Sequence, residues 1–202
     1  GANVINMSLG ATWNSSVLED AVNYAWGKGV VVVAAAGNNG DSTPFYPAYY
    51  ANAMAVAATD SNDILASWSN RGDWVDAAAP GVSIYSTLKD NGYGYKSGTS
   101  MASPHTAGLA ALLFAVAADD DGDGRLNDEV RSRIESNSDA LSSTGIGYGR
   151  INAFKAVTGS SPLSGAIAGS VIDSSKGTPI TGANVTNGVS AASTDANGAY
   201  IL

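Results

Sequence analysis

The sequence of 202 residues contains no cysteine, a single histidine, and no apolar run long enough to span a membrane. The absence of cysteine excludes disulfides, thiol catalysis and thiolate metal sites. Basic residues are also scarce, at 10 against 18 acidic ones, which leaves a net charge of −8. Phosphate and anionic lipids repel such a chain, so we expect neither nucleic acid nor a membrane as a partner.

The chain is rich in residues that build a packed core. Hydrophobic residues make up 45% of it and charged residues only 14%, which is typical of a globular domain and not of a disordered chain. No signal peptide opens the sequence, and Gly1 leads within three residues into an apolar run. We therefore expect the chain to begin inside a domain.

The first 36 residues predict a strand, a helix and a second strand. Residues 4–9 form a short, mainly apolar run, and Ser16 begins a stretch with the spacing of a capping box. Apolar residues then recur at helical intervals over 18–26. Residues 30–36 form a continuous run of valine and alanine, the pattern of a strand buried on both faces. This order implies a parallel sheet with a right-handed crossover.

The rest of the chain divides into an α/β part and a β-rich tail. Further strands are predicted at 52–58 and 74–79, and helices at 99–117, 128–136 and 151–157. Short strands are predicted at 167–172, 183–185 and 199–202. We predict an α/β fold with a parallel sheet flanked by helices in 1–157, a linker at 158–164 and a partial β-sandwich in 165–202.

The most specific stretch, GTSMASPH, runs from Gly98 to His105. It places Ser100 where a glycine-bearing loop enters an apolar helix. There the hydroxyl can face a substrate carbonyl, while the unpaired N–H groups of the helix start can face the oxyanion that forms. Taken alone, a short Gly-Thr-Ser more often marks a helix N-cap.

The whole octet resembles the nucleophile motif of the subtilisin-like serine proteases, and other segments resemble this family in the same order. VINMSLG at 4–10 is similar to the strand that binds substrate, and VVVAAAGN at 31–38 to the strand that ends in the oxyanion-hole asparagine. AAPGV at 78–82 and GYGRINA at 147–153 are similar to later landmarks. The resemblance covers residues 1–157, makes the expected fold subtilisin-like and incomplete at its N-terminus, and is nearest to the thermitase-like branch.

The resemblance implies a secreted serine endopeptidase that cleaves polypeptides through an acyl-enzyme on Ser100. Asn38 then matches the side-chain donor to the oxyanion, although an asparagine after a glycine is, in isolation, more often a turn residue. Phe45 is expected near the floor of the first specificity pocket. The substrate-binding residues implied by the resemblance are Ser8, Leu9, Gly10, Ala35, Ala36, Gly37, Phe45 and Thr99.

The sequence lacks two residues that an active enzyme of this family needs beside the serine, the catalytic Asp and the catalytic His. In this family the catalytic Asp and His precede the Ser along the chain, so we expect both in an N-terminal half outside these residues. His105 lies five residues after Ser100, on a different helix face, and we interpret it as a core histidine. The 202 residues alone are therefore expected to be inactive, and the complete protein active. A catalytically dead peptide-binding module is the alternative; no Gly-x-Ser-x-Gly elbow supports an esterase.

Six of the 18 acidic residues lie between Asp119 and Glu129 and suggest a structural calcium site. Carboxylates at alternate positions before a glycine suit a calcium loop, but Val130 holds the twelfth position, where a bidentate carboxylate is expected. The alternative is a solvated acidic connector that caps the next helix. The candidate ligands are Asp119, Asp121, Asp123, Arg125, Asp128 and Glu129.

The tail, between residues 169 and 200, resembles the carboxypeptidase regulatory-like β-sandwich. Such modules are accessory and extracellular, and the glycine-containing turns suit hairpins. A calcium-binding surface or adhesion protein built on this tail is a second alternative. It leaves the matching contexts of Asn38 and Ser100 unexplained.

Overall fold

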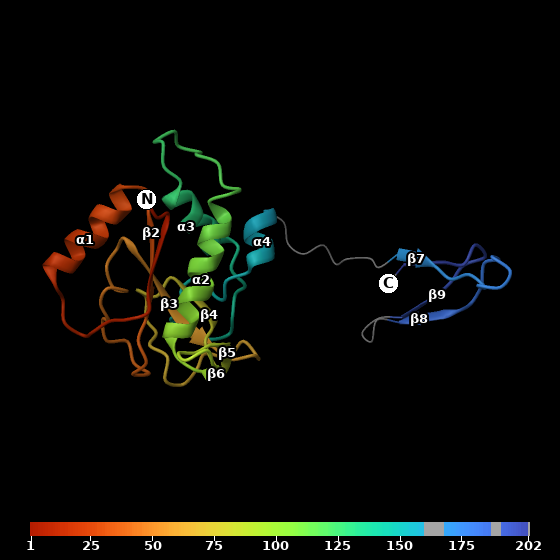
Figure 1. Cartoon of the computed structure of the whole chain (residues 1–202), viewed down its shortest axis with the longest axis horizontal. Helices are drawn as coiled ribbons and strands as arrows, with labels where there is room; N and C mark the ends of the chain where they lie inside the picture. Colours follow the sequence, from red (N-terminus) through yellow and green to blue (C-terminus); the bar gives the residue numbers. More distant parts are fainter. Residues whose placement is uncertain (160–167, 187–190, 202) are drawn as a thin grey trace. The chain divides into compact units, whose positions relative to one another are not determined.

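The computed structural model describes residues 1–159, 168–186 and 191–201, and it separates into two compact units, Gly1–Gly159 and Ser160–Leu202. Figure 1 shows the first unit as a sheet flanked by helices. Among the described residues, no helix has both the length and the apolar character that a membrane crossing requires.

A four-stranded parallel sheet forms the centre of the first unit. Its order is β1-β2-β3-β4, and Val4 of β1 lies opposite Val31 of β2. The helix α1 connects these first two strands, as the sequence predicted. The strands are β1 (Val4–Met7), β2 (Val31–Ala35), β3 (Ala53–Thr59) and β4 (Ala77–Pro80), and α1 spans Ser16–Gly27.

The remaining elements of the first unit follow β4 in the chain. A two-stranded antiparallel hairpin, β5 (Ile84–Thr87) and β6 (Tyr93–Lys96), precedes the long helix α2 (Thr99–Leu113). Two shorter helices, α3 (Asn127–Ser136) and α4 (Ala153–Thr158), come after it. Helix α2 packs across all four strands of the parallel sheet.

The alternation of side chains along β2 shows that the sheet has a helix layer on each face. Val31 and Val33 are fully buried in a core shared with α2. Val32 points the other way and packs with Val22 of α1 and with Tyr50. Since successive side chains of a strand face opposite sides, α1 and α2 cover opposite faces of the sheet. The predicted α/β fold is therefore confirmed for this unit.

The second unit contains short antiparallel strands. Strand β7 pairs with β10, and β8 pairs with β9. These strands are β7 (Ala168–Ser170), β8 (Asn184–Thr186), β9 (Ala191–Ser193) and β10 (Ala199–Ile201). The β-rich character agrees with the sequence, whereas the regulatory-like sandwich stays a prediction. Residues 160–167, which hold most of the expected linker, lie outside the described residues.

Several predicted boundaries were wrong, for local reasons. Ser15, not Ser16, caps α1, because its hydroxyl accepts a hydrogen bond from the N–H of Leu18. Strand β4 begins only at Ala77, since the N–H of Val75 closes a turn onto the carbonyl of Gly72. Helix α2 ends at Leu113 instead of continuing to 117, and β5 and β9 were not expected.

Candidate active site

Ser100 lies in the first turn of α2, at the carboxyl edge of the parallel sheet. The cap residue of this helix is Gly98, which has no side chain, so neither Thr99 nor Ser100 acts as the N-cap. The Ser100 side chain is half-buried. Its hydroxyl is therefore not used to stabilise the helix start and remains available for chemistry.

Asn38 follows the end of β2 and is held by Thr99. Its side-chain oxygen Oδ1 accepts hydrogen bonds from the Thr99 N–H at 2.9 Å and from the Thr99 hydroxyl at 3.0 Å. The Thr99 side chain is fully buried, and its Oγ1 also accepts a bond from the N–H of Gly37 at 3.1 Å. Because a backbone N–H can only donate, the Asn38 oxygen must face Thr99, which turns the amide nitrogen Nδ2 away from it.

Two nitrogen donors, the backbone nitrogen of Ser100 and Nδ2 of Asn38, lie near the Cα of Gly98. A Cβ placed on Gly98 would lie 3.7 Å from the Ser100 nitrogen and 3.8 Å from Asn38 Nδ2. Within the described part of the chain, neither nitrogen donates a hydrogen bond to another residue. Two unpaired donors on one small space form the arrangement that stabilises an oxyanion.

Ser8, just after β1, is joined to Ser100 by two hydrogen bonds. The Ser100 hydroxyl donates to the Ser8 carbonyl at 3.3 Å, and the Ser8 hydroxyl donates to the Ser100 carbonyl at 2.9 Å. Leu9 follows with 56% of its surface exposed, and Gly10 is exposed as well. Residues 8–10 therefore pass directly beside the serine and keep an open side toward solvent.

Residues 35–37 lie across from residues 8–10, at the end of the neighbouring strand. Ala35, Ala36 and Gly37 are all buried. Phe45 is half-buried and its ring lies close to the backbone of both Gly10 and Gly37. The structure thus brings Gly37, Phe45 and Gly10 close together, while their role in binding substrate stays a prediction.

The sequence did not indicate the residues that support this edge. Ser103 donates to the Asn6 side chain at 2.6 Å, and Asn6 donates to the Ser8 hydroxyl at 3.0 Å, which ties β1 to α2. The fully buried Asn70 donates to the carbonyl of Ala36 at 2.9 Å. Asn6, a polar residue within the apolar run of β1, was the available signal for such a role, whereas Asn70 stands among polar and charged residues and its sequence context gave no signal.

No side chain in the described residues is placed to activate the serine. The hydrogen bonds of the Ser100 hydroxyl include no carboxylate and no imidazole. His105 is exposed, and its Nδ1 lies 2.8 Å from the carbonyl of Met101. The interpretation of His105 as a core histidine was therefore wrong. It lines a groove of about 820 Å³ between α2 and the hairpin β5–β6.

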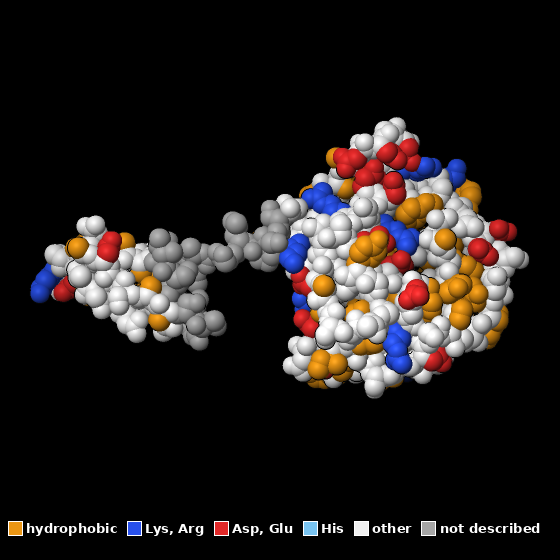
Figure 2. Space-filling view, turned by 180° about the vertical axis from the view of Figure 1, so that it is seen from behind, with side chains coloured by type: hydrophobic (Ala, Val, Ile, Leu, Met, Phe, Trp, Pro, Cys, Tyr) orange, Lys and Arg blue, Asp and Glu red, His pale blue; other side chains and the backbone are white. Residues whose placement is uncertain are grey.

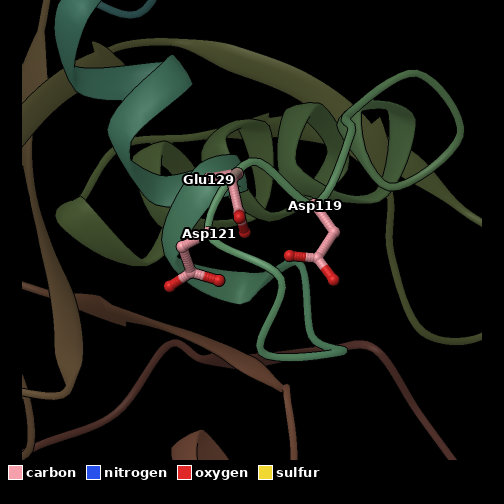
Figure 3. Close-up of side chains that lie close together, drawn as sticks. All are labelled: Asp119, Asp121 and Glu129. Atoms are coloured by element: carbon pink, nitrogen blue, oxygen red, sulfur yellow. The ribbon is translucent and has the colours of Figure 1, made fainter.

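The acidic loop between α2 and α3 brings three of the candidate metal ligands together. Carboxylate oxygens of Asp119, Asp121 and Glu129 lie within 4.8 Å of one another. Figure 3 shows these three side chains close together on the loop and the start of α3. Glu129 Oε1 accepts a hydrogen bond from the N–H of Asp120 at 3.0 Å, whereas Oε2 is buried and has no partner among the described residues. Hydrogen bonds from the N–H groups of Gly122 and Gly124 lower the pKa of Asp119, which keeps it charged.

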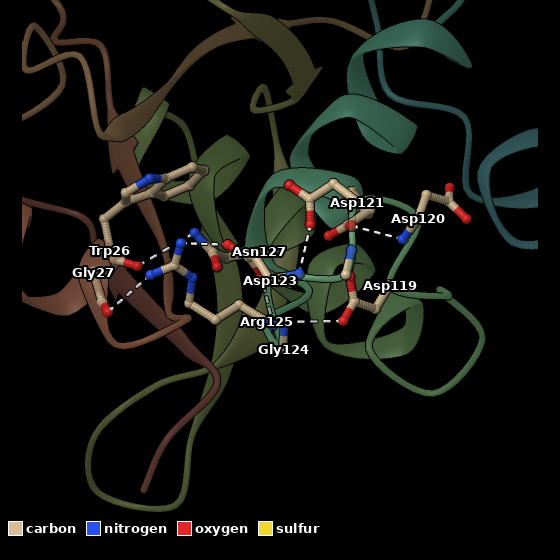
Figure 4. Close-up of polar contacts among 11 residues, drawn as sticks. Trp26, Gly27, Asp119, Asp120, Asp121, Asp123, Gly124, Arg125 and Asn127 are labelled. Atoms are coloured by element: carbon tan, nitrogen blue, oxygen red, sulfur yellow. Dashed lines mark hydrogen bonds and ion pairs between the residues drawn. The ribbon is translucent and has the colours of Figure 1, made fainter.

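The other three candidate ligands lie outside this group. Asp123 forms an ion pair with Arg125, whose side chain also reaches the carbonyl of Gly27 at 3.4 Å (Figure 4). Burial raises the pKa of Asp128, and the adjacent charge of Glu129 adds to that effect. Figure 2 shows acidic side chains gathered in one region of the first unit's surface.

A parallel α/β fold with a helix-start serine and an amide donor at the carboxyl edge of its sheet is compatible with the serine hydrolase class. A comparison with protein families shows the family to which this fold and site belong. Residues 1–149 match the model of the Subtilase family. The chain belongs to the subtilase family.

Individual relatives agree with this assignment. A thermophilic serine proteinase of Bacillus sp. (strain AK1) is 59% identical over 160 residues, which cover 78% of this chain and 38% of that protein. Thermitase of Thermoactinomyces vulgaris is 54% identical over 159 residues, which cover 54% of its length. These identities support the thermitase branch. The matched part of the chain therefore spans 38% of the length of the first relative and 54% of the second.

A solved structure supports the fold independently. A protease from Pseudoalteromonas arctica PAMC 21717 superposes with a TM-score of 0.71 at 35% sequence identity, covering 78% of this chain and 51% of that protein. The subtilisin-like fold predicted for the first unit is confirmed by this likeness.

Proposed function

We propose that this chain supplies the nucleophile and the oxyanion site of a serine endopeptidase. In this proposal Ser100 is the nucleophile, and Asn38 and the Ser100 N–H are the oxyanion donors. The observation that carries the proposal is that the Ser100 nitrogen and Asn38 Nδ2, which donate no hydrogen bond among the described residues, lie 3.7 and 3.8 Å from one point, the position of a Cβ on Gly98. Two such donors would serve an oxyanion, which forms during catalysis and not in a module that only binds peptide.

The proposed reaction proceeds in two steps through an acyl-enzyme. Ser100 Oγ attacks the carbonyl carbon of a peptide bond as its proton passes to a base, and the carbonyl oxygen becomes an oxyanion that accepts from Asn38 Nδ2 and the Ser100 N–H. The C–N bond then breaks, and the amine leaves with that proton. Water hydrolyses the resulting ester and restores the serine. Ser8, Leu9 and Gly10 would pair with the substrate backbone as an added strand.

The base and its orienting carboxylate come, in this proposal, from an N-terminal half that this chain does not contain. Strand β1 is an edge strand of a parallel sheet, a position that is normally covered. Near Ser100 the hairpin β5–β6 exposes Tyr85 and Tyr95 at 60% and 70%, and Met101 and His105 line the adjoining groove. Exposed apolar surface of this kind marks an interface, and here its occupant would be that missing half. The complete protein would act on polypeptides outside the cell.

An active-site phosphonate tests the proposal on the chain as it stands. A serine hydroxyl without a base is a weak nucleophile, so we expect the 202 residues alone to remain unlabelled by a fluorophosphonate. Adding the upstream residues of the same protein should produce stoichiometric labelling at Ser100, measured by intact mass and peptide mapping.

Two outcomes would contradict this expectation. Stoichiometric labelling of the isolated chain would show that no missing base is needed. A correctly folded complete protein that neither reacts with the phosphonate nor cleaves casein would eliminate the peptidase proposal and leave the binding module.

We further infer that the acidic loop binds a structural calcium ion through Asp119, Asp121 and Glu129. Three carboxylates with oxygens within 4.8 Å of one another repel, and a cation between them would remove that repulsion. Glu129 Oε2, which has no hydrogen-bond partner among the described residues, offers it a free oxygen. The ion would join the loop to the first turn of α3. No step of the proposed hydrolysis involves this ion.

Calcium should therefore raise the melting temperature of the chain. An ion that binds only the folded state stabilises it by about 2.7 kcal/mol at a concentration 100 times Kd. Glu129→Gln keeps the hydrogen bond to Asp120 but removes the charge, so it should abolish the calcium-induced shift. Asp20→Asn, an exposed acidic residue of α1, is the control and should keep the shift. The absence of both binding heat and a melting shift in the unmodified chain would refute the site.

A further inference from the structure

The turn that carries Asn38 also contains an asparagine that is followed by glycine. Asn39 is exposed and Gly40 is half-buried. In an Asn-Gly sequence the glycine nitrogen can attack the side-chain carbonyl carbon of the asparagine, because glycine has no side chain to block the approach. The asparagine Cγ–Nδ2 bond breaks, ammonia leaves, and water then opens the resulting succinimide. The product is aspartate or isoaspartate, and in isoaspartate the main chain passes through the side chain.

Neither of the two groups that must react at Asn39 is held by a hydrogen bond. Within the described residues, the Gly40 nitrogen donates to no acceptor, and the Asn39 side chain has no hydrogen-bond partner. The nitrogen is therefore free to give up its proton to hydroxide, and the side chain is free to rotate toward it. Both requirements for ring closure are met at this position.

The other two Asn-Gly pairs of the described residues are better protected. Asn197 precedes a buried glycine, whose nitrogen donates to the carbonyl of Asp195 at 3.0 Å. Asn91 precedes a glycine whose nitrogen donates to the carbonyl of Lys89 at 3.4 Å, in a tight turn where Asn91 has φ 56°. Of these three asparagines, Asn39 is therefore the one that we expect to react first.

Asn38 is protected by the same structure that leaves Asn39 open. The nitrogen that would attack the Asn38 side chain is that of Asn39, and it donates to Oδ1 of the fully buried Asn70 at 2.8 Å. The Asn38 side chain is itself held by the N–H and the hydroxyl of Thr99 at 2.9 and 3.0 Å. Asn38 should thus remain an asparagine while the next residue changes.

The turn is tied on both sides of the bond that isoaspartate would lengthen. The N–H of Asn39 is bonded as described above, and the carbonyl of Asp41 accepts from the N–H of Arg71 at 3.0 Å. Gly40 lies between these two points with φ 73°, and a Cβ on it would lie 2.8 Å from the carbonyl oxygen of Ser67. A main chain with one more carbon must therefore shift the turn, and with it the preceding residue, which is the proposed oxyanion donor.

We propose that Asn39 is a site of spontaneous isoaspartate formation, and that this change lowers the activity of the peptidase as the enzyme ages. The first part depends only on the contacts of residues 38–40, whereas the second part rests on the proposed function. Aspartate, the other product, adds a charge at an exposed position but leaves the main chain unchanged. It should therefore alter kcat little.

The first part is tested on the chain of 202 residues. The folded chain would be incubated in a mildly alkaline buffer below its melting temperature, and samples would be analysed by peptide mapping and by enzymatic methylation of isoaspartate. Asn39 should convert faster than Asn91 and Asn197, and Asn38 should stay unchanged. In guanidinium, which unfolds the chain, the difference among the three Asn-Gly pairs should disappear. Faster conversion of Asn91 or Asn197 in the folded chain, or no conversion of Asn39, would overturn the inference.

The second part is tested on the complete peptidase, with Asn39→Gln as the matched variant. Glutamine keeps the amide, but its longer side chain would have to close a larger ring, which forms far more slowly. During incubation the unmodified enzyme should lose kcat in proportion to its isoaspartate content at Asn39, and intact mass shows that self-cleavage is not the cause. Asn39→Gln should keep its kcat, and freshly prepared Asn39→Asp should resemble the fresh unmodified enzyme.

The failure of this inference and the failure of the proposed function can be told apart. Equal losses of kcat in the unmodified enzyme and in Asn39→Gln, or an unchanged kcat at high isoaspartate content, would overturn the inference and leave the peptidase proposal intact. A fresh, folded enzyme that cleaves no casein would instead refute the proposed function. The isoaspartate measurement on the chain does not depend on that activity.

Discussion

Replacing Ser100 by alanine in the complete peptidase should lower kcat for peptide hydrolysis by about 10⁶-fold, a magnitude that we take from the nucleophile of a subtilisin. The change removes the only atom that we propose to bond covalently to the substrate. The fold should survive, because among the described residues the Ser100 hydroxyl makes one hydrogen bond, of 3.3 Å, to Ser8. KM should change little, since the substrate-binding backbone of residues 8–10 is untouched. Steady-state kinetics on a p-nitroanilide, with thermal melting as the check of folding, measures both effects.

Ser142→Ala provides the comparison for this result. Ser142 is exposed and lies far along the chain from the turn 98–100, so its removal should leave kcat and KM as they were. Phosphonate labelling should disappear from Ser100→Ala and persist in Ser142→Ala. Retention of a tenth or more of the activity by Ser100→Ala would mean that another residue is the nucleophile.

The layers of the first unit could be predicted because their signals are local. The continuous apolar runs of β2 and β3 demand burial on both faces, and both strands are buried along their whole length. The hairpin β5–β6 was harder to predict from the sequence. Its strands are short and largely exposed, so their residues show no alternation of apolar and polar side chains. What stabilises it includes contacts among the rings of Tyr85, Tyr93 and Tyr95, which no periodicity encodes.

The contact between Asn38 and Thr99 could not be predicted from pattern alone. The two residues are 61 positions apart, and only the sheet and α2 together bring them within 2.9 Å. The family resemblance indicated Asn38 and Ser100, but it gave Thr99 as a substrate-binding residue. The structure places the Thr99 side chain in the interior, bonded to Asn38 and Gly37. The hydrogen bonds of Thr99 are those of a residue that positions the Asn38 side chain.

The error over His105 has a physical cause as well. Helix α2 is apolar almost all round, which normally indicates burial on every side. In this chain, however, Pro104, His105 and Leu112 line a shallow exposed groove on one side of the helix. An apolar helix face that remains exposed is what we expect where a further part of the domain packs, in line with the proposed N-terminal half.

Replacing Asn38 should give the second largest loss of activity. Removal of the corresponding donor from a subtilisin lowers kcat by about 10²- to 10³-fold, and we expect the same range for Asn38→Leu. The loss should fall on kcat and spare KM, because the donor acts on an oxyanion that exists only after attack. Asn38→Leu also removes the acceptor for Thr99, so a second variant is needed to separate the two roles.

Asn38→Asp makes that separation. In the unmodified chain the Thr99 N–H and hydroxyl donate to Asn38 Oδ1 at 2.9 and 3.0 Å, and the carboxylate of the variant keeps an oxygen for both. The carboxylate replaces the Nδ2 donor by a second oxygen, which repels the oxyanion. Its kcat should therefore fall at least as far as that of Asn38→Leu, while its melting temperature stays nearer to that of the unmodified enzyme. Asn39→Asp adds the same charge one residue further on, at an exposed side chain, and should change kcat little. Equal losses in Asn38→Asp and Asn39→Asp would assign the effect to charge and remove Asn38 from the oxyanion site.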